Sequence, residues 1–188
     1  MNIFDIAKQN QEKAWQVIKN TNIIQIWEDA GAKINLVGSL RTGLLMKHRD
    51  IDFHIYSSPL NLTDSFQAMA RLAENPSIKR IECANLLHTA EACIEWHAWY
   101  QNEENELWQM DMIHIREGSR YDGYFEKVAQ RISEIMTDEI RETILRLKYE
   151  TPETEKIIGV EYYQAVIRMG CGIIADLRNG ESSILLQE

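Results

Sequence analysis

The chain has 188 residues, of which 45% are hydrophobic and 26% are charged, and this composition is that of an ordinary globular protein. Its 20 Lys and Arg residues are outnumbered by 29 Asp and Glu residues, so the net charge is −9 and the estimated pI is 5.1. A protein that follows a nucleic acid backbone usually carries a basic face, and this charge balance argues against such a partner. The length suits one domain, or a small domain with a helical extension.

The same simple features predict a cytoplasmic protein that does not enter a membrane. No apolar run approaches the length needed to span a bilayer. Residues 1–5 lack the basic start and the apolar core of a signal peptide. Cys83, Cys93 and Cys171 match neither a disulfide framework nor a zinc pattern, so we expect three reduced thiols.

Hydrophobic spacing predicts alternating helices and strands in the first two thirds of the chain. In chain order we expect helices over the first thirty residues up to Gly31, strands at 33–37 and 51–56, a helix at 63–74, and strands at 79–87, 92–101 and 107–115. The last two strands alternate apolar and polar residues and are separated by a polar turn at 102–105, which is typical of a hairpin. The pattern therefore indicates an α/β (α+β) fold with a mixed sheet flanked by helices.

The remainder of the chain, from Tyr121 onward, has helical spacing. Thr151 followed by Pro152 is a typical helix start, and the predicted helix continues to Arg178. We divide the chain into a core at 1–118 and a C-terminal helical region at 119–188. The long apolar stripes between 121 and 180 are a candidate surface for a homodimer or a helical partner.

Residues 38–52 carry the most informative pattern in the chain. An apolar run stops at Gly38-Ser39, and a second one starts at Asp50-Ile51-Asp52. Residues i and i+2 of a strand share a face, so Asp50 and Asp52 place two carboxylates side by side with Cα atoms roughly 7 Å apart. Mg²⁺ prefers one or two carboxylates together with substrate phosphates. Ser39 and the free N–H groups of a helix start can bind a phosphate, so the segment predicts a metal–phosphate site.

The segment resembles the nucleotidyltransferase superfamily of DNA polymerase beta. Gly-Ser, a glycine four positions later and Asp-Ile-Asp after seven more positions occur in minimal members, and Gly38, Ser39, Gly43, Asp50 and Asp52 fall in that register. The stretch from His48 to Phe53 is also similar to lincosamide and aminoglycoside nucleotidyltransferases. The match covers about 20 residues in detail and residues 35–115 in outline.

The resemblance implies transfer of a nucleoside monophosphate, with AMP favoured, from a nucleoside triphosphate to a hydroxyl. Gly38 and Ser39 would hold phosphates together with Arg41, the basic residue nearest the turn. Asp50 and Asp52 would bind Mg²⁺, with ATP as the favoured co-substrate. A further carboxylate from a neighbouring strand would complete a two-metal site. Asp111, a charge within an apolar strand, is the candidate for this metal-binding and catalytic role.

Several alternatives stay open at this point. Glu95 on the partner strand of the hairpin is the second choice for the third carboxylate, and His114 could face the acceptor. Trp96, Trp99 or Trp108 could stack on a base, although core packing is the simpler interpretation. Because the chain is acidic and lacks a Lys/Arg run, we expect a small-molecule acceptor, for which a cationic one is a candidate, and no long nucleic acid.

A different class of function is also compatible with the sequence. Small proteins of this superfamily pair with helical partners in two-component modules such as toxin–antitoxin pairs. A non-catalytic or partner-bound protein of this fold is therefore the alternative hypothesis. Intact carboxylates at Asp50, Asp52 and Asp111 favour the enzyme.

Overall fold

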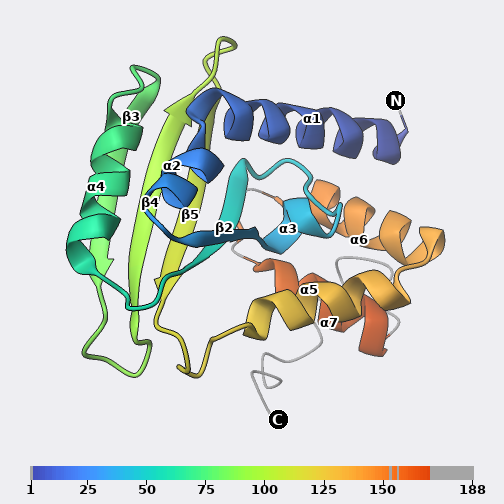
Figure 1. Ribbon diagram of the computed structural model, residues 1–188. Coiled ribbons are helices and arrows are strands. Elements are labelled where there is room, and N and C mark those ends of the chain that lie inside the picture. Colours follow the sequence, from blue (N-terminus) through green and yellow to red (C-terminus); the bar gives the residue numbers. More distant parts are fainter. Residues whose placement is uncertain (1, 153, 156, 170–188) are drawn as a thin grey trace.

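The computed structural model describes residues 2–169 apart from 153 and 156, and Figure 1 shows how their helices and strands are arranged. The helices are α1 (Ile3–Thr21), α2 (Ile23–Asp29), α3 (Gly38–Arg41), α4 (Leu62–Ala73), α5 (Tyr124–Ile135), α6 (Asp138–Glu150) and α7 (Gly159–Met169). The strands are β1 (Lys33–Leu36), β2 (Asp50–Tyr56), β3 (Ile78–Asn85), β4 (Cys93–Gln101) and β5 (Leu107–Ile115). No helix of the described residues combines the length and apolarity needed to cross a membrane.

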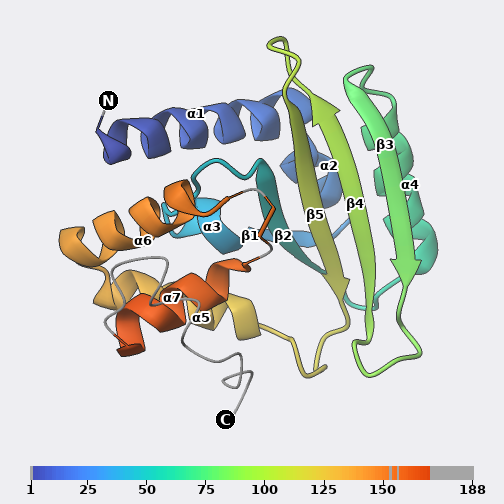
Figure 2. The same cartoon turned by 180° about the vertical axis from the view of Figure 1, so that it is seen from behind.

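The strands form a five-stranded sheet in the order β1-β2-β5-β4-β3. β2 and β5 are parallel, and the other neighbouring strands are antiparallel (Figure 2). The hairpin predicted from alternation is confirmed as β4 and β5. The predicted mixed sheet with flanking helices is confirmed as well. This strand order puts β5 directly beside β2, the strand that carries both carboxylates of the sequence motif.

Only one face of the sheet is fully covered. From β2, Ile51, Phe53 and Ile55 point into this face and are 0% exposed. They meet α1, α2 and α4, which lie across the same side of the sheet in Figures 1 and 2. Alternate residues of β2, β4 and β5 point to the other face. His54, Tyr56, Cys93 and Ile115 are buried there, and the partly buried ones include Asp50, Asp52, Glu95, His97, Trp99, Gln109 and Asp111. The carboxylates of the sheet thus lie on the open face.

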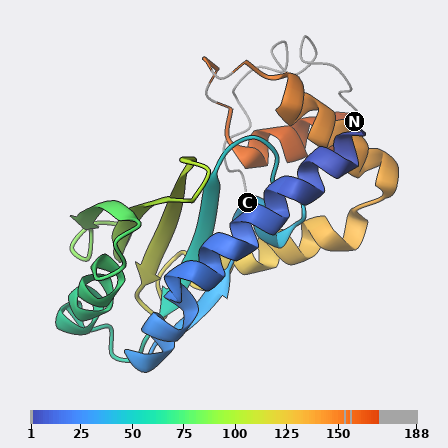
Figure 3. The ribbon, with the colours of Figure 1, turned by 90° about the horizontal axis from the view of Figure 1, so that it is seen from above.

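A second apolar cluster joins the helices that follow the sheet to the start of α1 (Figure 3). It contains Ile3, Ala7, Leu44, Met46, Ile132, Ile144, Leu145, Leu147, Tyr162, Tyr163 and Val166. Ile144 and Leu147 of α6 are buried in this cluster, whereas Tyr124, Phe125 and Ile135 of α5 are exposed. The predicted surface for a homodimer or helical partner is thus covered along α6 but not along α5, and the part of it at 170–180 lies outside the described residues.

Thr151 closes a helix instead of opening one. It is the C-cap of α6, and both its N–H, at 2.9 Å, and its hydroxyl, at 2.7 Å, donate to the carbonyl oxygen of Leu147. A threonine side chain can bond a carbonyl four residues earlier, and a proline just after a helix is as typical as one at its start. The next helix begins at Gly159, and the predicted continuation beyond Met169 lies outside the described residues.

Candidate active site

The turn between β1 and β2 is shaped by a glycine that no other residue could replace without strain. Gly38 opens α3 with a φ of +65°, a conformation that L side chains rarely adopt. A Cβ atom at this position would overlap Oδ2 of Asp52 and lie 2.7 Å from its Cγ. The N–H of Val37 also donates to the carbonyl oxygen of Asp52 at 2.9 Å. The turn is therefore packed directly against the second carboxylate of the motif.

The three predicted carboxylates gather on the open face of the sheet. Asp52 and Asp111 are register partners across the parallel pair β2–β5, so their backbones are about 4.8 Å apart. Asp50 lies two residues before Asp52 on the same face of β2. The structure thus brings Asp111 to the place that sequence reasoning expected, beside the Asp-x-Asp strand. Glu95, the second choice, pairs with Ile113, two positions further along β5.

Electrostatics show that these carboxylates interact. Burial, followed by the negative charges of Asp50 and Asp111, raises the pKa of Asp52 to about 7. The ammonium group of Lys148 and the N–H of Ser39 act in the opposite direction. The negative charge of the three carboxylates is therefore only partly compensated by the ammonium of Lys148 and the N–H of Ser39.

Lys148 of α6 is a site residue that sequence reasoning missed. Its side chain is buried, and its Nζ donates to Oγ of Ser39 at 2.7 Å and to the carbonyl oxygen of Leu44 at 3.0 Å. Oγ of Ser39 also lies 3.3 Å from the hydroxyl of Tyr163 on α7. Two helices far along the chain thus place a cation and a phenol on the serine of the motif.

The third carboxylate is hydrogen-bonded differently. Oδ1 of Asp111 lies 2.5 Å from Nδ1 of His97 on β4 and accepts a hydrogen bond from Nε2 of Gln109 at 2.7 Å. Among the described residues, no hydrogen bond reaches Oδ2. One oxygen of Asp111 is therefore occupied by the protein, and the other is left for a ligand.

The other residues that the sequence suggested for the site are Arg41, His114 and three tryptophans, and most of them do not face the carboxylates. Arg41 is exposed at the end of α3 and has no hydrogen bond or ion pair with the described residues, so its phosphate role stays a prediction. His114 is buried on the covered face, where burial lowers its pKa to about 4, so it does not face the open site. Trp96 and Trp108 are buried in the core, whereas Trp99 is on the open face.

The residues present fit a divalent cation. Asp50, Asp52 and Asp111 share one face, and burial followed by the charges of the other two carboxylates raises the pKa of Asp52, so a cation bound here would favour its charged form. Among the described residues, no group of three or more His, Cys, Asp or Glu side chains is arranged so that it could hold a metal ion by itself. An open set fits Mg²⁺, which typically takes one or two carboxylates and fills its other positions with substrate phosphates and water.

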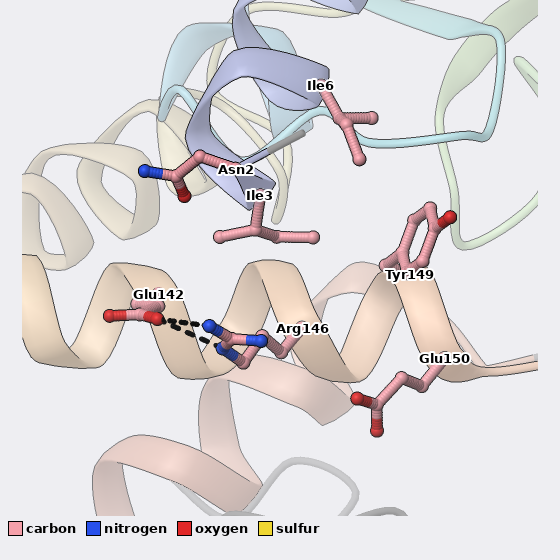
Figure 4. A pocket seen from close by; sticks show the side chains of 7 residues that line it. All are labelled: Asn2, Ile3, Ile6, Glu142, Arg146, Tyr149 and Glu150. Atoms are coloured by element: carbon pink, nitrogen blue, oxygen red, sulfur yellow. Dashed lines mark hydrogen bonds and ion pairs between the residues drawn. The ribbon is translucent and has the colours of Figure 1, made fainter.

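Two hollows of the described surface are separate from this site. Figure 4 shows the first, of about 540 Å³, between the start of α1 and α6, where Ile3 lies near the ion-paired side chains of Glu142 and Arg146. The second, of about 650 Å³, lies beside β1 and α5 and is lined by Asn35 and Glu126 among others. Neither is lined by the three carboxylates, so the carboxylates themselves mark the candidate active site.

Comparison with solved structures finds several chains that have the same fold. A chain of the Cid1 poly(U) polymerase with bound MgGTP matches with a TM-score of 0.61 and 13% identity over 87% of this chain and 53% of its own. A cytoplasmic RNA terminal U-transferase matches with a TM-score of 0.53 and 11% identity over 85% of this chain and 51% of its own. A chain of the GLD-2/RNP-8 complex matches with a TM-score of 0.59 and 8% identity over 98% of this chain and 71% of its own.

The chain therefore has the fold of these nucleotidyltransferases, and it spans about half the length of the first two. No protein-family model matches the sequence, and no curated protein matches it either. The fold that the resemblance implied is thus confirmed, whereas membership of the polymerase beta superfamily stays a prediction. The finer resemblance to its minimal, lincosamide and aminoglycoside members stays a prediction.

The comparison contradicts the prediction of a small-molecule acceptor without long nucleic acid. The first two solved chains with this fold are named for poly(U) and RNA terminal transfer. The net charge is a poor guide to the acceptor because a total of −9 describes the whole surface, whereas an acceptor meets only the face around the site.

Proposed function

We propose that the chain transfers a nucleoside monophosphate from a nucleoside triphosphate to a hydroxyl group. One observation carries this proposal: the Gly38-Ser39 turn packs on Asp52, which is in register with Asp111 on the adjacent parallel strand. A phosphate cradle and three carboxylates thus occupy one face. The fold shared with terminal nucleotidyltransferases supports the same reaction class.

Each residue has a proposed role. The Ser39 hydroxyl and the Lys148 ammonium, 2.7 Å apart, would donate to the leaving phosphates, and their charge and geometry suit an oxyanion. Asp50, Asp52 and Asp111 would hold Mg²⁺, which supplies charge neutralisation at the phosphates when bound. Arg41 would reach the phosphates from solvent.

In the proposed reaction, the acceptor oxygen bonds to the α-phosphorus. The bond from that phosphorus to the oxygen bridging it to the β-phosphate breaks, and pyrophosphate leaves. The proton of the acceptor hydroxyl passes to the carboxylate of Asp111, whose Oδ2 accepts no hydrogen bond from the described residues. Catalysis rests mainly on positioning and charge stabilisation, as in other phosphoryl transfers.

For the acceptor we propose the terminal hydroxyl of a single-stranded RNA. The solved chains with this fold support this choice, and so does the open face of β3 and β4. The guanidinium of Arg80 lies 4.1 Å from the ring centre of Trp99, and Trp99 pairs in register with Gln109, two residues before Asp111. An aromatic ring with an arginine is the usual platform for unpaired bases.

The test is extension of a labelled single-stranded RNA with Mg²⁺ and each of the four nucleoside triphosphates in turn. ATP is the favoured donor from the sequence motif, and UTP is the donor that the fold neighbours suggest. Asp52→Asn keeps the shape of the side chain and should abolish extension. Extension by Asp52→Asn at the parent rate would contradict the assignment of the site.

A further inference from the structure

Asp111 is held by two donors on one oxygen, unlike Asp50 and Asp52. His97, its register partner on β4, and Gln109, two residues earlier on β5, both bond Oδ1. Against a carboxylate, Nδ1 of His97 acts as an N–H donor. The hydrogen bonds of the described residues include no side-chain donor to Asp50 or Asp52. The third carboxylate is thus the one whose orientation the protein fixes through side chains.

Two strands as fully paired as β4 and β5 do not need this contact to stay together. Their register runs without a break from the pair of Cys93 with Ile115 to the pair of Gln101 with Leu107. On the other face, Ala98 and Met110 are 0% exposed in the main core. A partly exposed histidine–carboxylate pair adds little to the stability of such a sheet.

We infer that His97 is a positioning residue for Asp111, an inference that rests on the proposed function. A free aspartate side chain beside two like charges would turn away from them, because repulsion favours the rotamer that increases the separation. The donors on Oδ1 hold the carboxylate in place and leave Oδ2 for the cation and the acceptor hydroxyl. Partners that hydrogen-bond a metal-binding carboxylate typically change metal affinity or activity by about 10- to 100-fold when removed.

The test compares two substitutions of His97 by the binding of Mn²⁺, used in place of Mg²⁺. His97→Leu removes the donor, and His97→Asn keeps an N–H close to the position of Nδ1. Free Mn²⁺ is measured by electron paramagnetic resonance with a non-hydrolysable nucleoside triphosphate present, so no turnover is needed. We expect His97→Leu to weaken Mn²⁺ binding about 10- to 100-fold and His97→Asn to stay near the parent value.

Two further variants separate positioning from a general effect. In an Asp111→Asn background, His97→Leu should cause no additional loss, because the carboxylate that it orients is already absent. His88→Leu is the matched control, since His88 is exposed and its ring makes no hydrogen bond with the described residues. It should leave Mn²⁺ binding unchanged.

The outcomes distinguish this inference from the proposal beneath it. If the parent chain binds no Mn²⁺ with the nucleotide, the proposed function is wrong and the inference with it. If the parent binds Mn²⁺ and His97→Leu binds it equally well, the inference alone is overturned. Equal loss in His97→Leu and His97→Asn would also overturn it, because the N–H would then not be the group that matters.

Discussion

Gly38 and Asp52 are in such close contact that the glycine has no room for a side chain. A Cβ atom on Gly38 would overlap Oδ2 of Asp52, and the φ of +65° at Gly38 is strained for any residue with a Cβ. The two parts of the sequence motif therefore depend on each other in space. The glycine allows the turn and also leaves the volume in which the carboxylate sits.

Gly38→Ala should disrupt nucleotide binding as well as stability. The backbone conformation alone costs about 1–2 kcal/mol, and the displaced Asp52 adds the loss of a metal-binding group. Gly31→Ala is the matched control, because Gly31 has a φ of +78° and no atom within 4 Å of the position of a Cβ. Both variants should lower the melting temperature, but only Gly38→Ala should lose nucleotide affinity in a calorimetric titration. Equal nucleotide affinity in the two variants would contradict the role of the turn.

The raised pKa of Asp52 predicts how the stability of the metal-free protein changes with pH. Burial and the neighbouring carboxylates raise its folded pKa to about 7, from an ordinary value of 3.8. Between these two values the folded state binds more protons than the unfolded state, so its stability falls as pH rises from about 4 to 7. Asp52→Asn removes this term. The variant should therefore melt at a higher temperature than the parent at pH 8 and show a smaller difference at pH 5.

The measurement is a series of melting curves between pH 5 and 8 in the presence of a chelator. Glu103→Gln is the control, because Glu103 is an exposed carboxylate in the turn between β4 and β5. Glu103→Gln should change the melting temperature by the same amount at every pH, or not at all. A lower melting temperature for Asp52→Asn at pH 8 would mean that the charged carboxylate stabilises the fold.

The sequence predicted the parts of the site that depend on local spacing. A period of two placed Asp50 and Asp52 on one face, and alternation in the hairpin separated Trp96 from His97. The position of Asp111 followed from the resemblance, which implied a third carboxylate on a neighbouring strand, and its charge within an apolar run singled it out. These rules act over a few residues, so they survive folding unchanged.

The parts that were missed come from distant segments of the chain. Lys148 and Ser39 are 109 positions apart, and a lysine in the last turn of a helix normally interacts with the helix dipole and solvent. One signal was present: Ile140, Ile144 and Lys148 are spaced by four, so the lysine continues an apolar stripe. A charge on a buried stripe requires a partner, but local spacing cannot say which one.

Lys148→Met should weaken nucleotide binding without unfolding the protein. Methionine has a similar length and suits the apolar surroundings, and replacing a buried charge with an apolar side chain often leaves stability unchanged or raised. A hydrogen bond to a charged group contributes about 1.5–3 kcal/mol, so we expect about a 10- to 100-fold loss of affinity for a non-hydrolysable nucleoside triphosphate in calorimetry.

The control for this change is Lys47→Met. Nζ of Lys47 donates to the carbonyl oxygens of Tyr149 and Thr151 at the end of α6, so this lysine holds the segment between α3 and β2 against the helix. Its loss should lower the melting temperature and leave nucleotide affinity near the parent value. Unchanged affinity in Lys148→Met would show that Lys148 only fills space.

Trp99 provides the test of the proposed RNA acceptor. Its ring lies on the open face beside the carboxylates and is covered by the guanidinium of Arg80. Stacking of one base on an aromatic side chain contributes about 1–3 kcal/mol by alanine substitution. Trp99→Ala should therefore weaken the binding of a short single-stranded RNA in a fluorescence anisotropy titration, and Trp99→Phe should retain part of the affinity.

Trp15→Ala is the control, because Trp15 is 49% exposed on α1, whose packing face lies on the covered side of the sheet. Equal RNA affinity in Trp99→Ala and Trp15→Ala would place the acceptor elsewhere, whereas a loss confined to Trp99→Ala, with nucleotide affinity intact, would place the RNA on this face.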